Sequence, residues 1–503
     1  MPETIRFKPV PFLSALCLAL AGCEPSGDPA DPSSGTPAEA PSGFATEGPA
    51  APDAKNTPGA SQVTALVGGT LIDGTGDGPL ADAVVLIDGT RIAAVGASGD
   101  VAIPEGARTV DVGGKWLAPG LIDAHVHFME SGRIYTKPGQ IDLTHLVPYD
   151  EEVAWMQQRV PVTLKSYLCA GVTGAVSVGG PRFEYEVREQ ARARPDAPDV
   201  YVAHGPVTLV PAETLFPPFD GDVSVRSVTG PGSAAETVRQ GAQWKADLVK
   251  TGYLGGPFAD YEKDYAAMHE AIVAESAVHG FKVTTHVTEL EPARTLVELG
   301  VDSLQHLPLD GPLDAAFLEL AKSSGVVIVP TLAVWRRNFV DVYDRSFDLL
   351  PIEKQCGDPQ VIASWYEVDE LPAPPPEVTE MYGGVMAVAA GNTKRLLDAG
   401  VPLAAGSDTG NLGLLHGPSL HYELKLMGEA GVPPSELIVA ATLHAARVAG
   451  QADRVGSIEP GKQADLLVLD ADPLADIGNL QAIGRVIKSG AMFNQATLLP
   501  PAE

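Results

Sequence analysis

Residues 117–127 read LAPGLIDAHVH and form the stretch that decides the fold. Its short apolar run predicts a buried β-strand. Because side chains two positions apart lie on the same face of a strand, we expect His125 and His127 to point together. At the carboxyl end of a barrel strand, both would face the mouth where active sites form. The stretch therefore predicts a barrel strand that ends in two convergent imidazoles.

The middle of the chain, residues 119–454, alternates short apolar runs with helical patterns. Repeated β–α units imply a parallel sheet, and this many of them favour an α/β fold of the TIM-type (β/α)8 barrel class. A doubly wound open sheet is the alternative, but no glycine-rich phosphate loop follows the first strand. The other predicted strands are residues 174–178, 200–203, 248–250, 283–286, 303–306, 326–329 and 403–406, and the clearest helices are residues 265–279 and 292–299.

The two ends of the mature chain share a different texture. Residues 63–118 consist of short β-branched runs separated by turns, and the same texture returns in residues 455–503. We therefore predict a small β-sandwich domain built from both termini. Residues 335–384 are long and irregular and include a proline-rich run, so we interpret them as an insertion over the barrel mouth that acts either as a lid or as surface decoration.

Composition restricts the function. The chain has 503 residues, of which 45% are hydrophobic, enough for a sizeable core. Its 64 acidic and 34 basic residues give a formal net charge of -30, which argues against nucleic acid as a partner. Of the four cysteines, only Cys169 and Cys356 lie in the globular part. We expect them to be ordinary core residues, and a bridge between them is left open.

The first residues have the pattern of an export signal. Arg6 and Lys8 precede an apolar run that is too short to span a bilayer, and the run ends in Leu-Ala-Gly-Cys at residues 20–23. This ending resembles the bacterial lipobox, which implies a signal peptide over residues 1–23, lipidation of Cys23, and export to the periplasmic or surface side of a membrane. Residues 24–62 are rich in Pro, Ser, Gly and Ala and are predicted to be a disordered linker.

Further polar residues follow predicted strands. His286, His306 and Asp408 each lie at the end of an apolar run, and Lys250 closes another. Alone, each would more often be a packed or solvated side chain, but together with His125 and His127 they fall in an order suited to one site. Imidazole nitrogens and carboxylate oxygens are zinc ligands. An ammonium group cannot ligate a cation, so Lys250 must be modified, displaced or merely nearby.

The chain resembles the amidohydrolase superfamily, in particular its prolidase-like and imidazolonepropionase-like branch. The similarity extends from about residue 63 to about residue 490. Besides residues 117–127, it is carried by residues 246–250 (ADLVK), 300–306 (GVDSLQH), 406–409 (GSDT) and 458–466 (IEPGKQADL).

This resemblance implies a role for each site residue. His125, His127 and Asp408 would bind one divalent ion, expected to be zinc, and His286 and His306 would bind a second. Lys250, carboxylated by carbon dioxide, would bridge the pair. A metal-bridging hydroxide would then cleave an amide or peptide bond of a small molecule, with Asp408 as the catalytic proton shuttle.

Two departures leave the substrate open. Thr288 stands where many relatives have a substrate-contacting tyrosine, and residues 171–175 lack a common motif of the second strand. Other residues considered for the pocket, or for a substrate carboxylate, are Arg182, His204, Tyr253, Trp335, Arg336 and Arg337. The alternatives are a mononuclear deaminase or cyclic-amide hydrolase with unmodified Lys250, and a catalytically inactive ligand-binding lipoprotein. The oligomeric state is left open.

Overall fold

A computed structural model describes residues 63–137, 141–369, 371 and 376–501. The predicted export signal, the lipidated Cys23 and the linker of residues 24–62 all lie outside these ranges. Within them, no helix combines the length and the apolar character that a membrane crossing requires.

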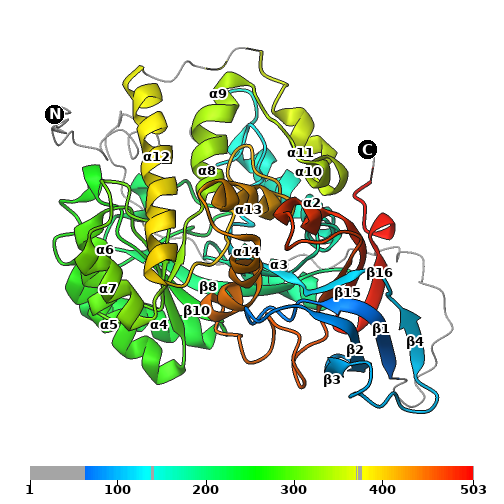
Figure 1. The fold of residues 1–503 in the computed structure, drawn as a ribbon. Helices are drawn as coiled ribbons and strands as arrows, with labels where there is room; N and C mark the ends of the chain where they lie inside the picture. Colours follow the sequence, from blue (N-terminus) through cyan, green and yellow to red (C-terminus); the bar gives the residue numbers. More distant parts are fainter. Residues whose placement is uncertain (1–62, 138–140, 370, 372–375, 502–503) are drawn as a thin grey trace, which may run out of the picture.

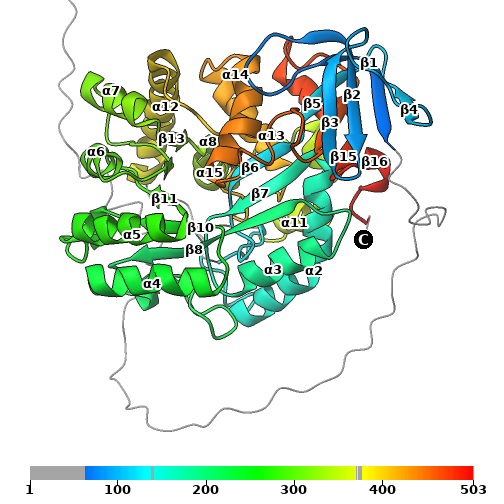
Figure 2. The ribbon, with the colours of Figure 1, turned by 90° about the horizontal axis from the view of Figure 1, so that it is seen from below.

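The middle of the chain forms a parallel barrel surrounded by helices (Figure 2). Neighbouring strands pair in chain order, with the two-residue β9 (Arg226–Ser227) added beside β8. The barrel strands are β6 (Leu121–Val126), β7 (Val172–Ser177), β8 (Asp199–Thr208), β10 (Leu248–Gly252), β11 (Lys282–His286), β12 (Ser303–Gln305) and β13 (Val327–Val329).

Residues 402–409 fill the eighth position without forming a regular strand. On one side, the Ile328 amide donates to the Pro402 carbonyl. On the other, the Ala124 amide donates to the Ala405 carbonyl, and the Asp408 amide donates to the His125 carbonyl. These bonds join β13 to β6 and nearly close the sheet, so the predicted TIM-type barrel is confirmed. Small and β-branched side chains such as Ala124 fill its interior.

Helices cover the outside of the barrel and pack on it through one continuous apolar core. The predicted helix over residues 265–279 forms at those residues, and the second forms one to two residues earlier than expected. The longer helices are α2 (Tyr149–Cys169), α3 (Phe183–Arg192), α4 (Pro231–Gln243), α5 (Tyr265–His279), α6 (Leu290–Glu298), α7 (Ala315–Ser324), α12 (Pro376–Ala399) and α13 (Ser419–Glu429), and the short α14 (Pro434–Val439) and α15 (Ala445–Val448) follow.

The two chain ends meet in one mixed sheet beside the barrel (Figure 1). Strand β5 runs directly into the barrel, and β14 pairs antiparallel with it, which brings the C-terminal strands into the sheet. The prediction that both termini build one small β-domain is therefore confirmed, and its eight strands form a single mixed sheet rather than the two sheets of the predicted β-sandwich. Its strands are β1 (Thr64–Leu71), β2 (Leu80–Asp88), β3 (Arg91–Ala97), β4 (Arg108–Asp111), β5 (Trp116–Pro119), β14 (Leu466–Leu469), β15 (Ile483–Lys488) and β16 (Ala491–Asn494).

The insertion at residues 335–384 is not irregular where the structure describes it. It begins at the end of α8 (Leu332–Arg336) and contains a π-helical turn (Arg337–Asp341), α9 (Val342–Asp344), α10 (Pro351–Cys356), α11 (Pro359–Ser364) and the start of α12. Pro351 and Pro359 each occupy the first turn of a helix, where the missing amide costs nothing. The prediction of an irregular segment is therefore wrong for the described residues, where Pro351 and Pro359 start helices. The proline-rich run on which it relied lies outside the described ranges at residues 372–375.

Cys169 and Cys356 form a disulfide, which the sequence left open. Cys169 ends α2 and Cys356 ends α10, so the bridge ties the insertion to a barrel helix. Their expected role as ordinary core residues is corrected accordingly. Their sequence separation of 187 explains why sequence alone could not pair them.

Candidate metal centre

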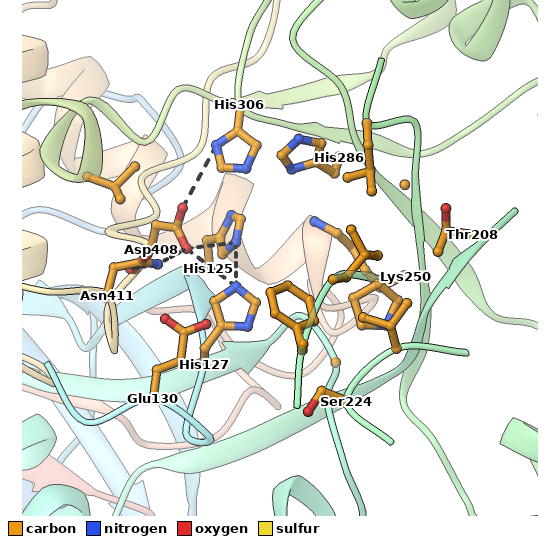
Figure 3. Close-up of a pocket in the computed structure, with 18 of the residues that line it drawn as sticks. His125, His127, Glu130, Thr208, Ser224, Lys250, His286, His306, Asp408 and Asn411 are labelled. Carbon is orange, nitrogen blue, oxygen red and sulfur yellow. Dashed lines mark hydrogen bonds and ion pairs between the residues drawn. The ribbon is translucent and has the colours of Figure 1, made fainter. Parts of the chain in front are cut away.

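The six predicted ligands line one cavity of about 200 Å³ at the carboxyl ends of the barrel strands. They come from β6 and the residue after it, from β10 and β11, from the residue after β12, and from the irregular eighth segment. Figure 3 shows His125, His127 and His306 around the Asp408 carboxylate, with His286 and the Lys250 amine on the far side of these rings. The six are His125, His127, Lys250, His286, His306 and Asp408.

Three of these side chains converge at ligand spacing. The Nε2 atoms of His125 and His127 are 3.2 Å apart, and they lie 3.2 and 3.4 Å from Oδ1 of Asp408. A tetrahedral ion with bonds of about 2.0–2.1 Å has ligand atoms roughly 3.3–3.4 Å apart. The triangle therefore fits a zinc-sized cation. The Nδ1 atoms of both histidines are buried without a hydrogen-bond partner in the described part of the chain.

His286 and His306 lie next to this triangle with their ring centroids 4.5 Å apart. Nδ1 of His306 is 2.6 Å from the Thr331 hydroxyl, which leaves Nε2 for another partner. Burial lowers the pKa of His286 to about 3 and that of His306 well below its usual value. Both rings are therefore neutral near pH 7, which is the form that binds metal.

His306 and Asp408 both have left-handed backbone, with φ of 67° and 57°. This conformation is rare for residues other than glycine and costs on the order of 1 kcal/mol at each position. Such strain persists only where the surroundings impose it, and it is common at functional sites.

Lys250 is 3% exposed. Within the described part of the chain, its amine makes no hydrogen bond or ion pair. Burial lowers its pKa to about 7, although the charge of Asp408 acts in the opposite direction. A large fraction of this amine is therefore neutral near pH 7, when it is both unprotonated and nucleophilic.

Asp123 is a fully buried carboxylate that contacts the segment of Asp408, and no role was predicted for it from the sequence. Its Oδ1 accepts from the Ser407 amide at 2.9 Å, and its Oδ2 accepts from the Ser407 hydroxyl at 2.5 Å. Burial raises its pKa to about 7. These bonds tie β6, which carries His125, to the segment that carries Asp408. The only signal in the sequence was that an acidic residue occupies an apolar strand.

A second buried carboxylate, Glu184, was also missed. It accepts from the Met129 amide at 2.7 Å and from the Ser177 hydroxyl at 2.7 Å, and so fixes the chain just after His127. Burial raises its pKa to about 7.

Most of the other residues considered for the pocket lie elsewhere. Thr288 and Trp335 line the cavity. Arg182 lies over the Trp244 ring, and His204 bonds to the Tyr185 hydroxyl. The remaining three also have partners outside the cavity: Tyr253 packs on Tyr265, Arg336 pairs with Asp341, and Arg337 pairs with Asp341 and Glu353.

Residues 116–492 match the amidohydrolase family. The chain is similar to the ochratoxinase of Aspergillus niger, with 26% identity over 483 residues that cover 88% of this chain and 89% of the relative. It is also similar to the imidazolonepropionase of Chloroflexus aggregans, with 26% identity over 453 residues that cover 82% and 91%. A solved Xaa-Pro dipeptidase with methionine bound in the active site shares the fold, with a TM-score of 0.65, 24% identity, and coverage of 86% and 100%.

Proposed function

The chain belongs to the amidohydrolase family, and from this premise we propose that it cleaves an amide or peptide bond with two divalent metal ions, zinc by preference. The observation that carries the proposal is the triangle of two imidazole nitrogens and one carboxylate oxygen at zinc-ligand spacing. His125, His127 and Asp408 would hold one ion, and His286 and His306 would hold the other.

Lys250 is proposed to bridge the ions as a carbamate. Its neutral nitrogen attacks the carbon of carbon dioxide, a carbon–nitrogen bond forms, and one proton leaves the nitrogen. The product carries one negative charge and two oxygen atoms, which are suitable ligands for divalent ions. The buried, unpaired amine supports this step because it loses its proton near neutral pH.

Bound divalent ions would supply an activated water molecule and polarise the scissile carbonyl. The residues of this chain direct the protons. The Asp408 carboxylate accepts the proton of the attacking water and then donates it to the leaving nitrogen. Its position is held by the Asn411 amide, which donates to Oδ1 at 3.1 Å.

The test is a hydrolysis screen with zinc-loaded protein lacking the residues before Gln62, using dipeptides, N-acyl amino acids and lactams. We expect turnover that disappears on chelation and returns with zinc. Activity that survives exhaustive chelation would contradict the proposal. One ion per chain with unmodified Lys250 would favour the mononuclear deaminase or cyclic-amide hydrolase, and metal binding without turnover would favour the inactive ligand-binding protein.

We also propose export and lipidation of Cys23. The lipobox-like residues 20–23 support it, and so does the Cys169–Cys356 bridge, because disulfides persist in oxidising compartments. Mass spectrometry of the mature N-terminus tests it: a diacylglyceryl group on Cys23 is expected. A Cys23→Ala chain that still fractionates with membranes would contradict it.

A further inference from the structure

One wall of the cavity is apolar. Its side chains come from the two connections that follow β8 and β10, and they pack together as one hydrophobic cluster. The five that line the cavity form the apolar wall, and Ser224 adds a hydroxyl group beside them. The apolar wall consists of Leu215, Phe216, Val225, Leu254 and Phe258. Such a surface binds an apolar group of the substrate, because contact removes both from water.

The connection that carries Phe216 is anchored to the start of α3. Phe219 is 1% exposed and stacks on Phe183, with the two ring centroids 5.0 Å apart. The Asp222 carboxylate accepts from the Arg182 amide at 2.7 Å. These contacts lie outside the cavity and fix the wall independently of a ligand. A preformed surface loses less conformational entropy on binding, so the wall can contribute to affinity.

The apolar wall lies across the barrel from Asp408. Around the ring, β10 is the fourth strand and residues 402–409 fill the eighth position, so the two segments face each other. Figure 3 shows Asp408 on one side of the rings of His125 and His127, and Thr208 and Lys250 on the other side. The two sides of the cavity therefore differ: one carries the proposed proton donor, and the other carries the wall.

This arrangement orients the scissile bond. Asp408 is proposed to donate a proton to the leaving nitrogen, so the nitrogen must face Asp408. In an amide, the nitrogen and the acyl substituent are attached to opposite sides of the carbonyl carbon. The acyl substituent therefore faces the apolar wall. The cavity of about 200 Å³ is smaller than most ligand pockets, which span roughly 300–1,000 Å³, so this substituent must be compact.

From the wall and its position we infer that the chain selects N-acyl compounds whose acyl group, rather than the leaving amine, carries a compact apolar or aromatic substituent. Phe216 is a specificity-determining residue for that substituent. The inference rests on the proposed hydrolysis and names the substrate class of the same site.

The test uses N-acetylglycine and two isomers that add one benzyl group to it. N-hydrocinnamoylglycine carries the benzyl group on the acyl side, and N-acetylphenylalanine carries it on the amine side. All these compounds have one amide bond and one carboxylate, so only the position of the apolar group changes. Steady-state kinetics with the zinc-loaded chain gives kcat/KM for each compound and for both enantiomers of N-acetylphenylalanine, and calorimetry with the metal-free chain gives Kd.

We expect kcat/KM of N-hydrocinnamoylglycine to exceed that of N-acetylglycine by at least about tenfold, because the benzyl group is buried against the wall. It should also exceed the value for either enantiomer of N-acetylphenylalanine. No gain over N-acetylglycine, or an equal or larger gain for the isomer with the benzyl group on the amine side, overturns the inference.

A variant tests the wall itself. Phe216 is half-buried and lines the cavity, so Phe216→Ala removes part of the apolar surface. We expect the ratio of kcat/KM for N-hydrocinnamoylglycine to that for N-acetylglycine to fall by at least about fivefold. The matched control is Phe281→Ala, which removes a half-buried phenylalanine just before β11, at the opposite end of the barrel, and should leave the ratio unchanged. An equal fall in both variants overturns the inference, and if Phe216→Ala fails to fold, the comparison of isomers still decides.

The failures of the two proposals are distinguishable. If turnover requires zinc but the benzyl group on the acyl side brings no gain, the substrate class is wrong and the hydrolase proposal stands. If no compound is turned over, but N-hydrocinnamoylglycine binds the metal-free chain more tightly than N-acetylglycine and Phe216→Ala removes the difference, the hydrolase proposal fails while the apolar site stands. The absence of both turnover and tighter binding overturns both proposals.

Discussion

Two buried lysines at opposite ends of the barrel have opposite surroundings. Lys488 on β15 is 5% exposed, and its amine lies 2.9 Å from both Asp199 and Asp465. Lys250 on β10 is 3% exposed and has no such partner within the described part of the chain. Burial lowers both pKa values, but the two carboxylates outweigh it at Lys488 and raise its pKa, whereas that of Lys250 falls to about 7.

This difference indicates a structural role for the paired Lys488 and a chemical role for the unpaired Lys250. Lys488 and Asp465 belong to the terminal sheet region, and Asp199 begins barrel strand β8, so the triad joins the two parts. Buried ion pairs of this kind join parts of a structure, and removing one partner leaves the others buried without a counter-charge. The unpaired Lys250 weakens the metal-free fold, which is the pattern expected where a residue is kept for function.

The largest expected effect is on activity. Lys250→Met removes the proposed bridge and should lower kcat/KM for any substrate found by the screen by at least about a thousandfold. Lys488→Met, the matched substitution at the other end, should leave kcat/KM of the folded protein within about threefold. Steady-state kinetics on both purified variants decides, and near wild-type activity in Lys250→Met would remove the basis of the comparison.

The next effect is on stability. Lys488→Met leaves Asp465 buried and unpaired and should lower the free energy of unfolding by about 3 kcal/mol. Lys488→Arg keeps the charge and should lower it less. Urea denaturation measures both, and a loss below about 0.5 kcal/mol for the methionine variant would show that the triad does not hold the two parts together.

A smaller effect concerns pH. The pKa of Lys250 is about 7 in the folded chain and 10.5 in the unfolded one, so the folded state binds fewer protons between these values. The stability of the metal-free chain should therefore rise with pH across this window, by about 2 kcal/mol between pH of about 7.5 and about 9.5. Lys250→Met has no amine to titrate at this position. The amount by which its free energy of unfolding exceeds that of the wild type should therefore shrink as pH rises. A constant difference would mean that Lys250 keeps its ordinary pKa.

The smallest effect belongs to Asp123. Asp123→Asn keeps the shape of the side chain but weakens its bonds to Ser407, and should lower zinc affinity by about tenfold. Competition with a chromophoric chelator measures this affinity. Glu184→Gln is a second test, because Glu184 fixes the chain just after His127. Unchanged zinc affinity in both variants would show that these carboxylates do not position the metal ligands.

The parts of the site that follow from short-range sequence patterns could be predicted. Strand alternation placed His125 with His127, and each remaining ligand follows an apolar run, so the barrel and the grouping of six side chains could be predicted. Asp123 and Glu184 could not, because their roles come from contacts between segments that are distant in the sequence. The helices of the insertion at residues 335–384 were not predicted, because a proline can start a helix, as Pro351 and Pro359 do, as well as end one.

The most direct test of the two-metal centre is elemental analysis of bound metal in the purified wild-type chain and in Lys250→Met. We expect two divalent ions per wild-type chain and one or none in the variant. Two ions in both proteins would contradict the bridging role of Lys250, and no ion in a fully active wild-type chain would contradict the metal centre itself.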